Sequence, residues 1–500
     1  MTLLQLHTPL QAARWLQERL TGTLSADSRK TGKGDGFIAW PGLATDGRCH
    51  VNAALAAGAA ACLVEHSGVE AFRFSNDSVA TYTGLKAQTG PIASLYFGVP
   101  ADRLQVAAVT GTNGKTSTAW WLAQALGRLG RTCGMVGTLG IGTPGAMVAN
   151  GLTTPDPVLL QQQLGRFVDD GFSTCVLEAS SIGLEERRLD GCRIQLAIFT
   201  NFTQDHLDYH ASMQAYWQAK KMLFSWPGLQ ACAINLDDAK GRELEAELAD
   251  AAMDIWTFSS TGPARLIATN VCQDAHGLRF DVVEGSERHA LTTAMVGLYN
   301  VSNLLGVIAS LRAWGVPLAD AVIACTDLLP VPGRTETLIT AGLPMVVIDY
   351  AHTPDALEKV LAALQPVARG RGGRLWCVFG CGGDRDANKR PQMAAIAEKS
   401  ADQLVLTSDN PRSEDPLIIL AQMREGLAGP QAVRLEPDRR VAIAHALACS
   451  EPHDVVLLAG KGHENYQEIK GVKLPFSDRE QAQDILNTLA AIRQPKAAAC

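Results

Sequence analysis

The sequence predicts an α/β protein of about three domains. Its 500 residues are too many for one hydrophobic core at roughly 150 residues per domain. Near residue 104 an apolar strand runs through a glycine-rich loop into a helix. Beyond residue 333, four short apolar runs alternate with helical patterns. Such alternation is typical of a parallel sheet with crossover helices.

The first hundred residues predict a small α/β domain. Turn-forming clusters at 31–36 and 41–42 separate short apolar runs such as 37–39 and 61–64. Glycine and proline at such spacing end one element and begin the next. We place this domain at residues 1–99.

A phosphate-binding loop follows the strand at 104–110. Glycines let the backbone close around an anion, and the next helix presents the positive end of its dipole. A lysine adds a mobile charge, and the threonine after it can hold Mg²⁺. Val109 stands where the common P-loop has its first glycine, so this loop is a shorter variant. The candidate residues are Gly111, Thr112, Asn113, Gly114, Lys115, Thr116 and Ser117.

Strands at 174–177 and 196–199 and a helix at 300–314 extend this unit, which we place at residues 100–332. Glu178 follows the first of these strands, where nucleotide-binding sheets place a carboxylate for Mg²⁺. The segment 200–210 contains two acids and two histidines. A strand-end acid or a single histidine such as His206 is also compatible with a structural role.

The third unit, residues 333–500, contains strands at 346–349, 375–379, 404–407 and 455–458. Ligands of parallel sheets bind beyond the carboxyl ends of the strands. The loops at those ends, which we call the rim loops, are rich in glycine and polar residues. They are 350–355, 380–386, 408–412 and 460–464. The glycines of the second loop have the spacing G-x-G-G, which argues against a dinucleotide site.

Composition excludes several functional classes. A net charge of -7 argues against a nucleic-acid partner. No run reaches the ~18 apolar residues of a membrane span, and residues 1–20 lack the features of a secretory signal. Twelve scattered cysteines indicate reduced thiols, mostly in the core. We expect a cytoplasmic protein.

Taken together, several short motifs resemble those of the Mur ligase family over nearly the whole chain. They are Gly111-Thr-Asn-Gly-Lys-Thr116, Glu178-Ala-Ser-Ser181, Asp205-His-Leu-Asp208, Ala219-Lys220, Asn300-Val-Ser-Asn303, Gly333-Arg334, Asp349-Tyr-Ala-His352 and Gly460-Lys-Gly-His-Glu464. The resemblance implies a UDP-sugar-binding N-terminal domain, a P-loop ATPase-like central domain and a Rossmann-like domain for the amino acid. It also implies ATP-dependent amide formation through an acyl phosphate, with release of ADP and phosphate.

The resemblance also implies roles for individual residues. Beyond the phosphate loop, ATP contacts would be Asn300, Arg334, Asp349 and His352. Magnesium would be served by Thr116, Glu178, His206 and a carbamylated Lys220. The catalytic set would be Lys115, Lys220, His206 and Arg334. From the sequence alone, Lys220 beside Lys221 on a helix instead favours a solvated charge pair.

For the UDP-sugar peptide, the matching positions are Ser28, Thr153, Thr154, Ser180 and Arg188. Three residues depart from the family pattern nearby. Leu152 replaces an asparagine, Ile182 a histidine and Glu186 a glutamine. These departures weaken the expected UDP-sugar contacts and leave the phosphate and metal set intact.

The resemblance is greatest to family members that add diaminopimelate to UDP-N-acetylmuramoyl-L-alanyl-D-glutamate in peptidoglycan precursor synthesis. Their amino-acid contacts would fall on Arg385, Asp409, Asn410, Pro411, Arg412, Gly460 and Glu464. Arg412 offers a planar fork for the far carboxylate of diaminopimelate. Lysine lacks that carboxylate and would leave Arg412 unpaired. The loss of binding free energy would be on the order of a few kcal/mol, which is enough for strong discrimination.

Other readings remain open at this stage. A folylpolyglutamate synthase shares the ATP-binding logic, although residues 26–29 and 409–412 argue against it. A P-loop regulatory switch would hydrolyse nucleotide without an amine acceptor, and a pure binding module would leave the magnesium residues idle. The expected partners are ATP, Mg²⁺, the UDP-sugar peptide and meso-diaminopimelate, with no nucleic acid and no membrane span. We expect a monomer.

Overall fold

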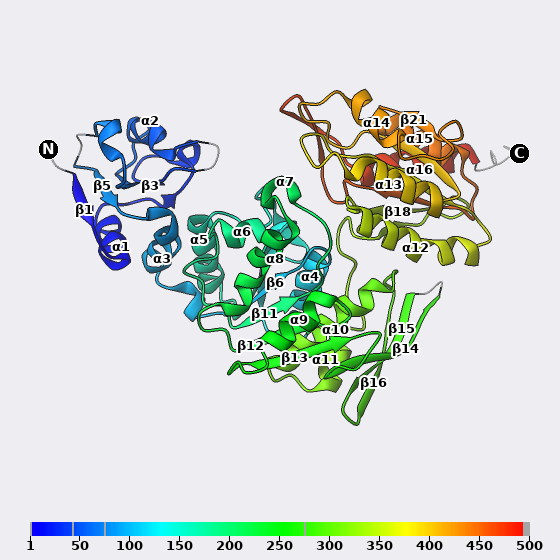
Figure 1. Cartoon of the computed structure of the whole chain (residues 1–500), viewed down its shortest axis with the longest axis horizontal. Helices are drawn as coiled ribbons and strands as arrows, with labels where there is room; N and C mark the ends of the chain where they lie inside the picture. Colours follow the sequence, from blue (N-terminus) through cyan, green and yellow to red (C-terminus); the bar gives the residue numbers. More distant parts are fainter. Residues whose placement is uncertain (1–2, 43–44, 75–76, 275–276, 494–500) are drawn as a thin grey trace, which may run out of the picture.

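The described residues fold around three large β-sheets that follow one another along the sequence, and a separate two-stranded sheet lies near the C-terminal end (Figure 1). The computed structural model describes residues 3–42, 45–74, 77–274 and 277–493. The last seven residues of the predicted third domain therefore lie outside the described part. In Figure 1 the first and third sheets occupy opposite ends of the molecule, with the second between them. The α/β fold class predicted from the sequence is confirmed.

The first sheet has five parallel strands in the order β1-β5-β4-β3-β2. Its central strands, β3 and β4, are fully buried and contain the two apolar runs predicted from the sequence. Its elements are β1 (Leu4–Leu6), α1 (Pro9–Gln17), β2 (Leu24–Ser25), η1 (Ser28–Lys30), β3 (Gly36–Ala39), η2 (Gly47–His50), α2 (Val51–Ala56), β4 (Ala61–Glu65), η3 (Val69–Phe72), β5 (Val79–Tyr82) and α3 (Leu85–Tyr96).

The second sheet has eleven strands in the order β16-β15-β14-β13-β12-β11-β6-β10-β7-β8-β9. Its strands are β6 (Gln105–Thr110), β7 (Cys133–Gly137), β8 (Gly140–Thr143), β9 (Ala146–Val148), β10 (Thr174–Glu178), β11 (Leu196–Phe199), β12 (Ala231–Asn235), β13 (Asp254–Ser259), β14 (Leu266–Asp274), β15 (Gly277–Glu284) and β16 (Glu287–Thr293). The middle of the sheet, from β7 to β14, is parallel, and antiparallel hairpins extend both edges.

Helices cover both faces of this sheet. They are η4 (Pro100–Asp102), α4 (Lys115–Arg128), α5 (Pro157–Asp169), α6 (Ser181–Glu185), α7 (Leu207–His210), α8 (Met213–Lys221), η5 (Met222–Ser225), α9 (Ala239–Glu247), α10 (Tyr299–Ala313) and α11 (Leu318–Ala324). One apolar core lies under α4, α10 and α11, and the other lies under α5 and α8. Because both faces are buried, the strands are nearly continuous apolar runs.

The third sheet has the order β17-β18-β22-β19-β20-β21, and only β17 is antiparallel to its neighbour. The four predicted strands are β18 (Met345–Asp349), β19 (Leu375–Phe379), β20 (Gln403–Thr407) and β22 (Val455–Ala459). The other elements are β17 (Glu336–Leu338), α12 (Pro354–Gly370), α13 (Lys389–Ser400), α14 (Pro416–Arg424), β21 (Arg434–Glu436), α15 (Arg439–Cys449), β23 (Tyr466–Ile469), β24 (Val472–Pro475) and α16 (Asp478–Arg493). The parallel-sheet prediction is confirmed for this unit.

Specific contacts join the three units. Helix α3 packs against α5, and the Gln273 side chain on β14 donates a 3.0 Å hydrogen bond to the carbonyl oxygen of Ala363 on α12. Asn113 in the phosphate loop donates to Asp355 at the start of α12 at 2.8 Å. Among the described helices, none combines the length and hydropathy needed to cross a membrane.

Candidate active site

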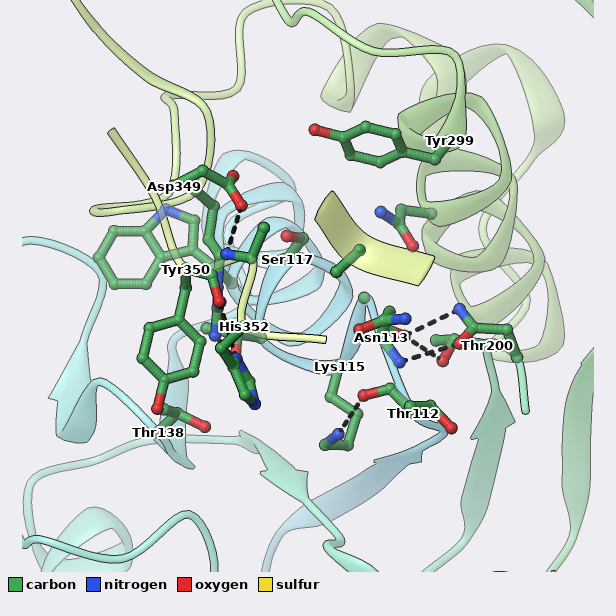
Figure 2. Close-up of a pocket in the computed structure, with 18 of the residues that line it drawn as sticks. Thr112, Asn113, Lys115, Ser117, Thr138, Thr200, Tyr299, Asp349, Tyr350 and His352 are labelled. Carbon is green, nitrogen blue, oxygen red and sulfur yellow. Dashed lines mark hydrogen bonds between the residues drawn. The ribbon is translucent and has the colours of Figure 1, made fainter. Parts of the chain in front are cut away.

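The loop from Gly111 to Gly114 joins β6 to α4 at the carboxyl edge of the second sheet. Gly111 has φ of 146°, and a Cβ atom there would lie 1.9 Å from the Thr200 hydroxyl oxygen. No side chain larger than hydrogen fits this position. The Lys115 Nζ atom donates to the carbonyl oxygens of Gly111 and Thr112, each at 2.9 Å. Lys115 therefore lies over its own loop, as Figure 2 shows, and burial lowers its pKa.

Glu178 lies beneath the start of α4. Its Oε2 atom accepts hydrogen bonds from the Thr116 hydroxyl at 2.9 Å and the Thr138 hydroxyl at 3.0 Å. The Thr138 backbone N–H donates to its Oε1 atom at 2.8 Å. The sequence predicted a strand that ends at residue 177 and is followed by Glu178. In the structure, β10 is one residue longer and Glu178 is its last residue. Only 1% of the residue is exposed, so its charge is held by hydroxyl and backbone donors.

His206 and Lys220 line the same cavity as the phosphate loop. His206 has a left-handed backbone conformation with φ of 53°, and its Nε2 atom is 3.5 Å from the Asp205 carboxylate. Burial lowers the pKa of His206 to about 4, against the opposing effect of Asp205. The imidazole is therefore neutral at neutral pH, the form that binds metal.

Lys220 on α8 is 1% exposed, so the solvated charge pair favoured by the sequence alone is wrong. Its Nζ atom donates a 2.7 Å hydrogen bond to the carbonyl oxygen of Gly111 and lies 4.4 Å from the centre of the Tyr216 ring. Burial, with a further contribution from the charge of Lys115, lowers the pKa of Lys220 well below its ordinary value. A buried lysine of this kind is a reactive amine.

The third sheet faces this loop with residues that precede β17 and with residues at and just after the end of β18. The Arg334 guanidinium stacks 4.2 Å from the centre of the Tyr350 ring, and its Nη2 atom is 3.4 Å from the Thr116 hydroxyl. The rings of Tyr350 and His352 are 4.7 Å apart and lie together opposite Lys115 (Figure 2). Asp349 accepts hydrogen bonds from the backbone N–H groups of Thr335 and Ala351. Arg334 is thus brought to the magnesium candidates although 218 positions separate it from Thr116.

Asn300, near the start of α10, completes the nucleotide candidates. Its Nδ2 atom donates to the carbonyl oxygen of Val296 at 2.8 Å, and its Oδ1 atom accepts from Asn303 at 3.0 Å. A Cβ atom at Gly114 would lie 2.4 Å from the Asn303 Oδ1 atom. Helix α10 therefore packs directly on the phosphate loop, and this contact requires a glycine there.

The predicted UDP-sugar contacts of the central unit form a connected group. The Thr154 hydroxyl lies 3.0 Å from the Ser180 hydroxyl, and Arg188 donates to the carbonyl oxygen of Thr154 at 3.0 Å. The Thr153 hydroxyl is 3.0 Å from that of Thr138, which links this group to Glu178. Ser28 lies apart from them in the first unit, within η1.

The predicted amino-acid contacts converge at the carboxyl edge of the third sheet. The Asn410 side chain donates to Glu464 at 2.8 Å, and the Gly383 N–H donates to the carbonyl oxygen of Asn410 at 2.9 Å. Arg412 has φ of 51° and donates to the carbonyl oxygen of Gly383 at 2.8 Å. These bonds join three of the rim loops, and Gly462 of the fourth loop packs against Tyr350 of the first. The four rim loops therefore meet at this edge of the sheet.

A cavity of about 1520 Å³ connects these groups. Candidate residues that line it are Thr112, Asn113, Gly114, Lys115, Thr116, Ser117, Thr153, Thr154, Ser180, Arg188, His206, Lys220, Asn300, Arg334, Asp349, His352, Arg385, Arg412 and Glu464. Candidates outside the lining set are Ser28, Gly111, Glu178, Asp409, Asn410, Pro411 and Gly460. Most of these seven residues support side chains that line the cavity, as Glu178 does by accepting a hydrogen bond from Thr116. Ser28 is the candidate that the structure leaves in a separate unit.

Thr138 and His463 were not among the site residues predicted from the sequence. Thr138 binds both carboxylate oxygens of Glu178, and it lines the same cavity as His463 of the third unit. Thr138 follows β7 without any surrounding polar cluster, so its position in the sequence carried little information. His463 lies in the rim loop 460–464, but the prediction for this loop was based on the neighbouring glycines and on Glu464.

A magnesium ion with bound phosphates is compatible with these residues. Within the described ranges, no three His, Cys, Asp or Glu side chains form a cluster able to hold a metal. The donors near the loop are instead the Thr116 hydroxyl and the Glu178 carboxylate, whose oxygens are 2.9 Å apart, and the neutral His206. Magnesium is commonly held by one or two protein groups together with water and substrate phosphates. The donor chemistry therefore fits this ion.

Comparisons with known proteins agree with the geometry. Residues 109–311 match the Mur ligase middle domain, and residues 333–462 match the glutamate ligase domain of Mur ligases. The UDP-N-acetylmuramoyl-L-alanyl-D-glutamate–2,6-diaminopimelate ligase of Acidovorax sp. strain JS42 is 58% identical over 488 residues, which cover 96% of this chain and 97% of the relative. A solved structure of a ligase with the same name superposes with a TM-score of 0.64 at 35% identity, covering 94% of this chain and 95% of that one.

A more distant solved structure shares the fold. The folylpolyglutamate synthase of Mycobacterium tuberculosis, complexed with ADP and AMPPCP, superposes with a TM-score of 0.62 at 21% identity. The match covers 74% of this chain and 91% of that chain.

Proposed function

Since the chain belongs to the Mur ligase family, we propose that it joins meso-2,6-diaminopimelate to UDP-N-acetylmuramoyl-L-alanyl-D-glutamate at the expense of ATP. One observation carries the proposal. A single cavity is lined by the phosphate-loop residues Lys115 and Thr116 and by the rim-loop residues Arg385, Arg412 and Glu464. Nucleotide chemistry and an amino-acid pocket therefore share one space.

Each of the three proposed domains binds one substrate. Residues 1–99 bind the UDP-sugar, residues 100–332 bind ATP, and residues 333–500 bind the amino acid. The substrate carboxylate attacks the γ-phosphorus of ATP with loss of ADP, and the diaminopimelate amine then displaces phosphate from the acyl phosphate. An acyl phosphate must be kept from water. A cavity walled by the second and third units supports such shielding.

In this scheme Lys115 holds the β- and γ-phosphates, and Arg334 faces the charge of the transferring phosphoryl group. Arg334 is held ready by its stacking on Tyr350 and by its approach to Thr116. Thr116, Glu178 and His206 would hold Mg²⁺, which neutralises phosphate charge when bound. Asn300, Asp349 and His352 would make the remaining adenosine and phosphate contacts.

We propose that Lys220 is carbamylated. The neutral amine, favoured by burial and by Lys115, is the form that adds to carbon dioxide. This addition forms an N–C bond and releases one amine proton, and the product is a carboxylate-like carbamate close to the Gly111 carbonyl oxygen that Lys220 contacts now. An unmodified ammonium at this place would repel a second magnesium ion.

For the UDP-sugar peptide, Thr153, Thr154, Ser180 and Arg188 are proposed as contacts of the central domain. Their hydrogen-bonded arrangement supports this assignment. Ser28 would join them from the N-terminal domain. We further propose that the enzyme acts as a monomer in the cytoplasm on these small molecules.

Diaminopimelate is favoured over lysine by the chemistry of the rim loops. Arg412, with Arg385 nearby on the cavity wall, suits the two carboxylates of diaminopimelate. Asp409, Asn410, Pro411, Gly460 and Glu464 complete the pocket. A folylpolyglutamate synthase is disfavoured because the 58% identical relative spans 96% of this chain, whereas the solved synthase shares the fold at 21% identity.

The decisive experiment measures phosphate release with ATP, Mg²⁺ and UDP-N-acetylmuramoyl-L-alanyl-D-glutamate. Three reactions are compared, with meso-diaminopimelate, with L-lysine and with no amino acid. We expect release with diaminopimelate alone. Release with lysine would leave a ligase of different selectivity, and release without any acceptor would favour a nucleotide switch and overturn the ligase.

A further inference from the structure

A fully buried lysine underlies the proposed amino-acid pocket. Lys461 follows β22, and its relative exposure is 0%. Its Nζ atom donates to the Glu464 carboxylate at 3.0 Å and to the Asn410 Oδ1 atom at 3.2 Å. The Nδ2 atom of Asn410 donates to the same Glu464 oxygen at 2.8 Å. The three side chains form a closed triangle of short contacts, which we call the Lys461 triangle.

The Lys461 triangle adjoins the cavity through Glu464. Glu464 lines the cavity together with Arg412 and Tyr466, whereas Lys461 lies behind it. Asn410 also accepts a hydrogen bond from the backbone N–H of Glu468 at 2.9 Å. The backbone N–H of Arg412 in turn donates to the carbonyl oxygen of Glu468 at 2.9 Å. One network therefore holds Glu464 and Arg412 in fixed relation.

The charge of Lys461 acts differently on the two candidate amino acids. The far end of diaminopimelate carries one ammonium and one carboxylate, so its net charge is zero. The far end of lysine carries an ammonium alone. A positive charge close behind Glu464 attracts the carboxylate and repels the ammonium of diaminopimelate, and these effects largely cancel. For lysine only the repulsion remains.

We propose that Lys461 is a specificity-determining residue that disfavours amino acids whose side chain ends in a lone ammonium. Arg412 gives the attractive part of the selection, and Lys461 gives the repulsive part. The inference rests on the proposed function, because it concerns the amino acid accepted by that reaction. Lys461 acts without touching the substrate, through the charge it places beside Glu464.

The test compares kcat/KM for meso-diaminopimelate and L-lysine in the unaltered enzyme and in two variants. Lys461→Met removes the charge and the donor, and Lys461→Gln removes the charge and keeps a donor toward Glu464. Both should lower the diaminopimelate-to-lysine ratio about tenfold or more, with Lys461→Gln retaining more activity toward diaminopimelate. Lys473→Met is the matched control, because Lys473 also lies near the Tyr466 ring, at 4.0 Å, but is exposed. Its ratio should equal that of the unaltered enzyme.

A second measurement needs no substitution at Lys461. L-norleucine has the length of lysine without the far ammonium, so the unaltered enzyme should use it better than lysine. Equal loss of both activities in the folded variants, or lysine preferred over norleucine, would overturn the inference. Absence of phosphate release with any acceptor in the unaltered enzyme would instead overturn the proposed function, and the inference with it.

Discussion

The Nζ atom of Lys220 lies 2.7 Å from the carbonyl oxygen of Gly111, so helix α8 is bonded directly to the phosphate loop. This contact places a buried amine beside Lys115, whose charge contributes to lowering the pKa of Lys220. Two lysines that would repel each other as cations thus share one loop. The arrangement is easier to maintain when one of them is neutral or has become an anion.

We expect Lys220 to be labelled by carbon dioxide near neutral pH. Its neighbour Lys221, which is partly exposed, should not be labelled. The lowered pKa means that the neutral amine of Lys220 persists to lower pH than an ordinary lysine amine, and it is lost as the pH falls through that lowered value. Carbon-13 NMR with labelled bicarbonate measures the carbamate. Lys220→Ala should remove the signal and Lys221→Ala should keep it. An identical signal in both variants would contradict carbamylation at Lys220.

Glu178→Gln should reduce activity roughly 10- to 100-fold and raise the magnesium concentration needed for half-maximal rate. The amide keeps one acceptor for the Thr116 and Thr138 hydroxyls but loses the charge that favours a cation. Phosphate release titrated with MgCl₂ measures the effect. Glu247→Gln, at an exposed ion pair with Lys221, serves as the control and should titrate like the unaltered protein. An unchanged magnesium titration for Glu178→Gln would remove this residue from the metal site.

Much of this site could be predicted because its residues follow apolar strands. The strand at 196–199 was predicted with the bounds of β11, and the rim loops follow four strands whose apolar runs are unmistakable. Burial of Lys220 could not be predicted, since it depends on Tyr216 and Gly111 from other parts of the fold. The hairpin of β15 and β16 was missed because β16 is largely exposed and lacks an apolar run.

Asp237 should stabilise the central unit above about pH 4 and lose this contribution as the pH falls toward 2. Burial alone would raise the pKa of Asp237, but hydrogen bonds from Ser259, Thr261 and Ser260 outweigh it and lower the value from 3.8 to about 2. A carboxylate with a depressed pKa stabilises the folded state above its unfolded pKa. After allowance for solvent screening, the contribution is about 1 kcal/mol.

The measurement for Asp237 is urea unfolding of Asp237→Asn and the unaltered protein at pH 6 and at pH 2.5. The difference in the free energy of unfolding should be about 1 kcal/mol at pH 6. It should shrink at pH 2.5, where the carboxylate is protonated in the unfolded chain and the pH approaches its pKa of about 2 in the folded protein. Asp250→Asn, at an exposed position, controls for the general effect of removing an acid. A difference that stays constant with pH would contradict the assignment.

Glu186, which stands where the family pattern has a glutamine, should be functionally coupled to Lys86. The Lys86 Nζ atom lies 2.8 Å from Glu186 Oε2, and the Tyr209 hydroxyl donates to Glu186 Oε1 at 2.8 Å. Lys86 belongs to α3 of the first unit, whereas Tyr209 belongs to α7, next to His206. A glutamate at this position can therefore link the first unit to the segment next to His206 through its ion pair with Lys86. A glutamine carries no charge and would bind Lys86 more weakly.

A double-mutant cycle on kcat/KM for the UDP-sugar peptide tests this link. Lys86→Met and Glu186→Gln should each reduce kcat/KM, and the double variant should resemble the single variants, with a coupling energy of about 0.5–1 kcal/mol for this partly exposed pair. The surface pair Lys240 and Glu243, which lies within α9, gives the reference cycle and should show no coupling in kcat/KM. Additive losses at Lys86 and Glu186 would mean that the two side chains act independently. Glu186 would then have to affect the UDP-sugar peptide through a direct contact, as the family's glutamine position implies, instead of through the orientation of the first unit.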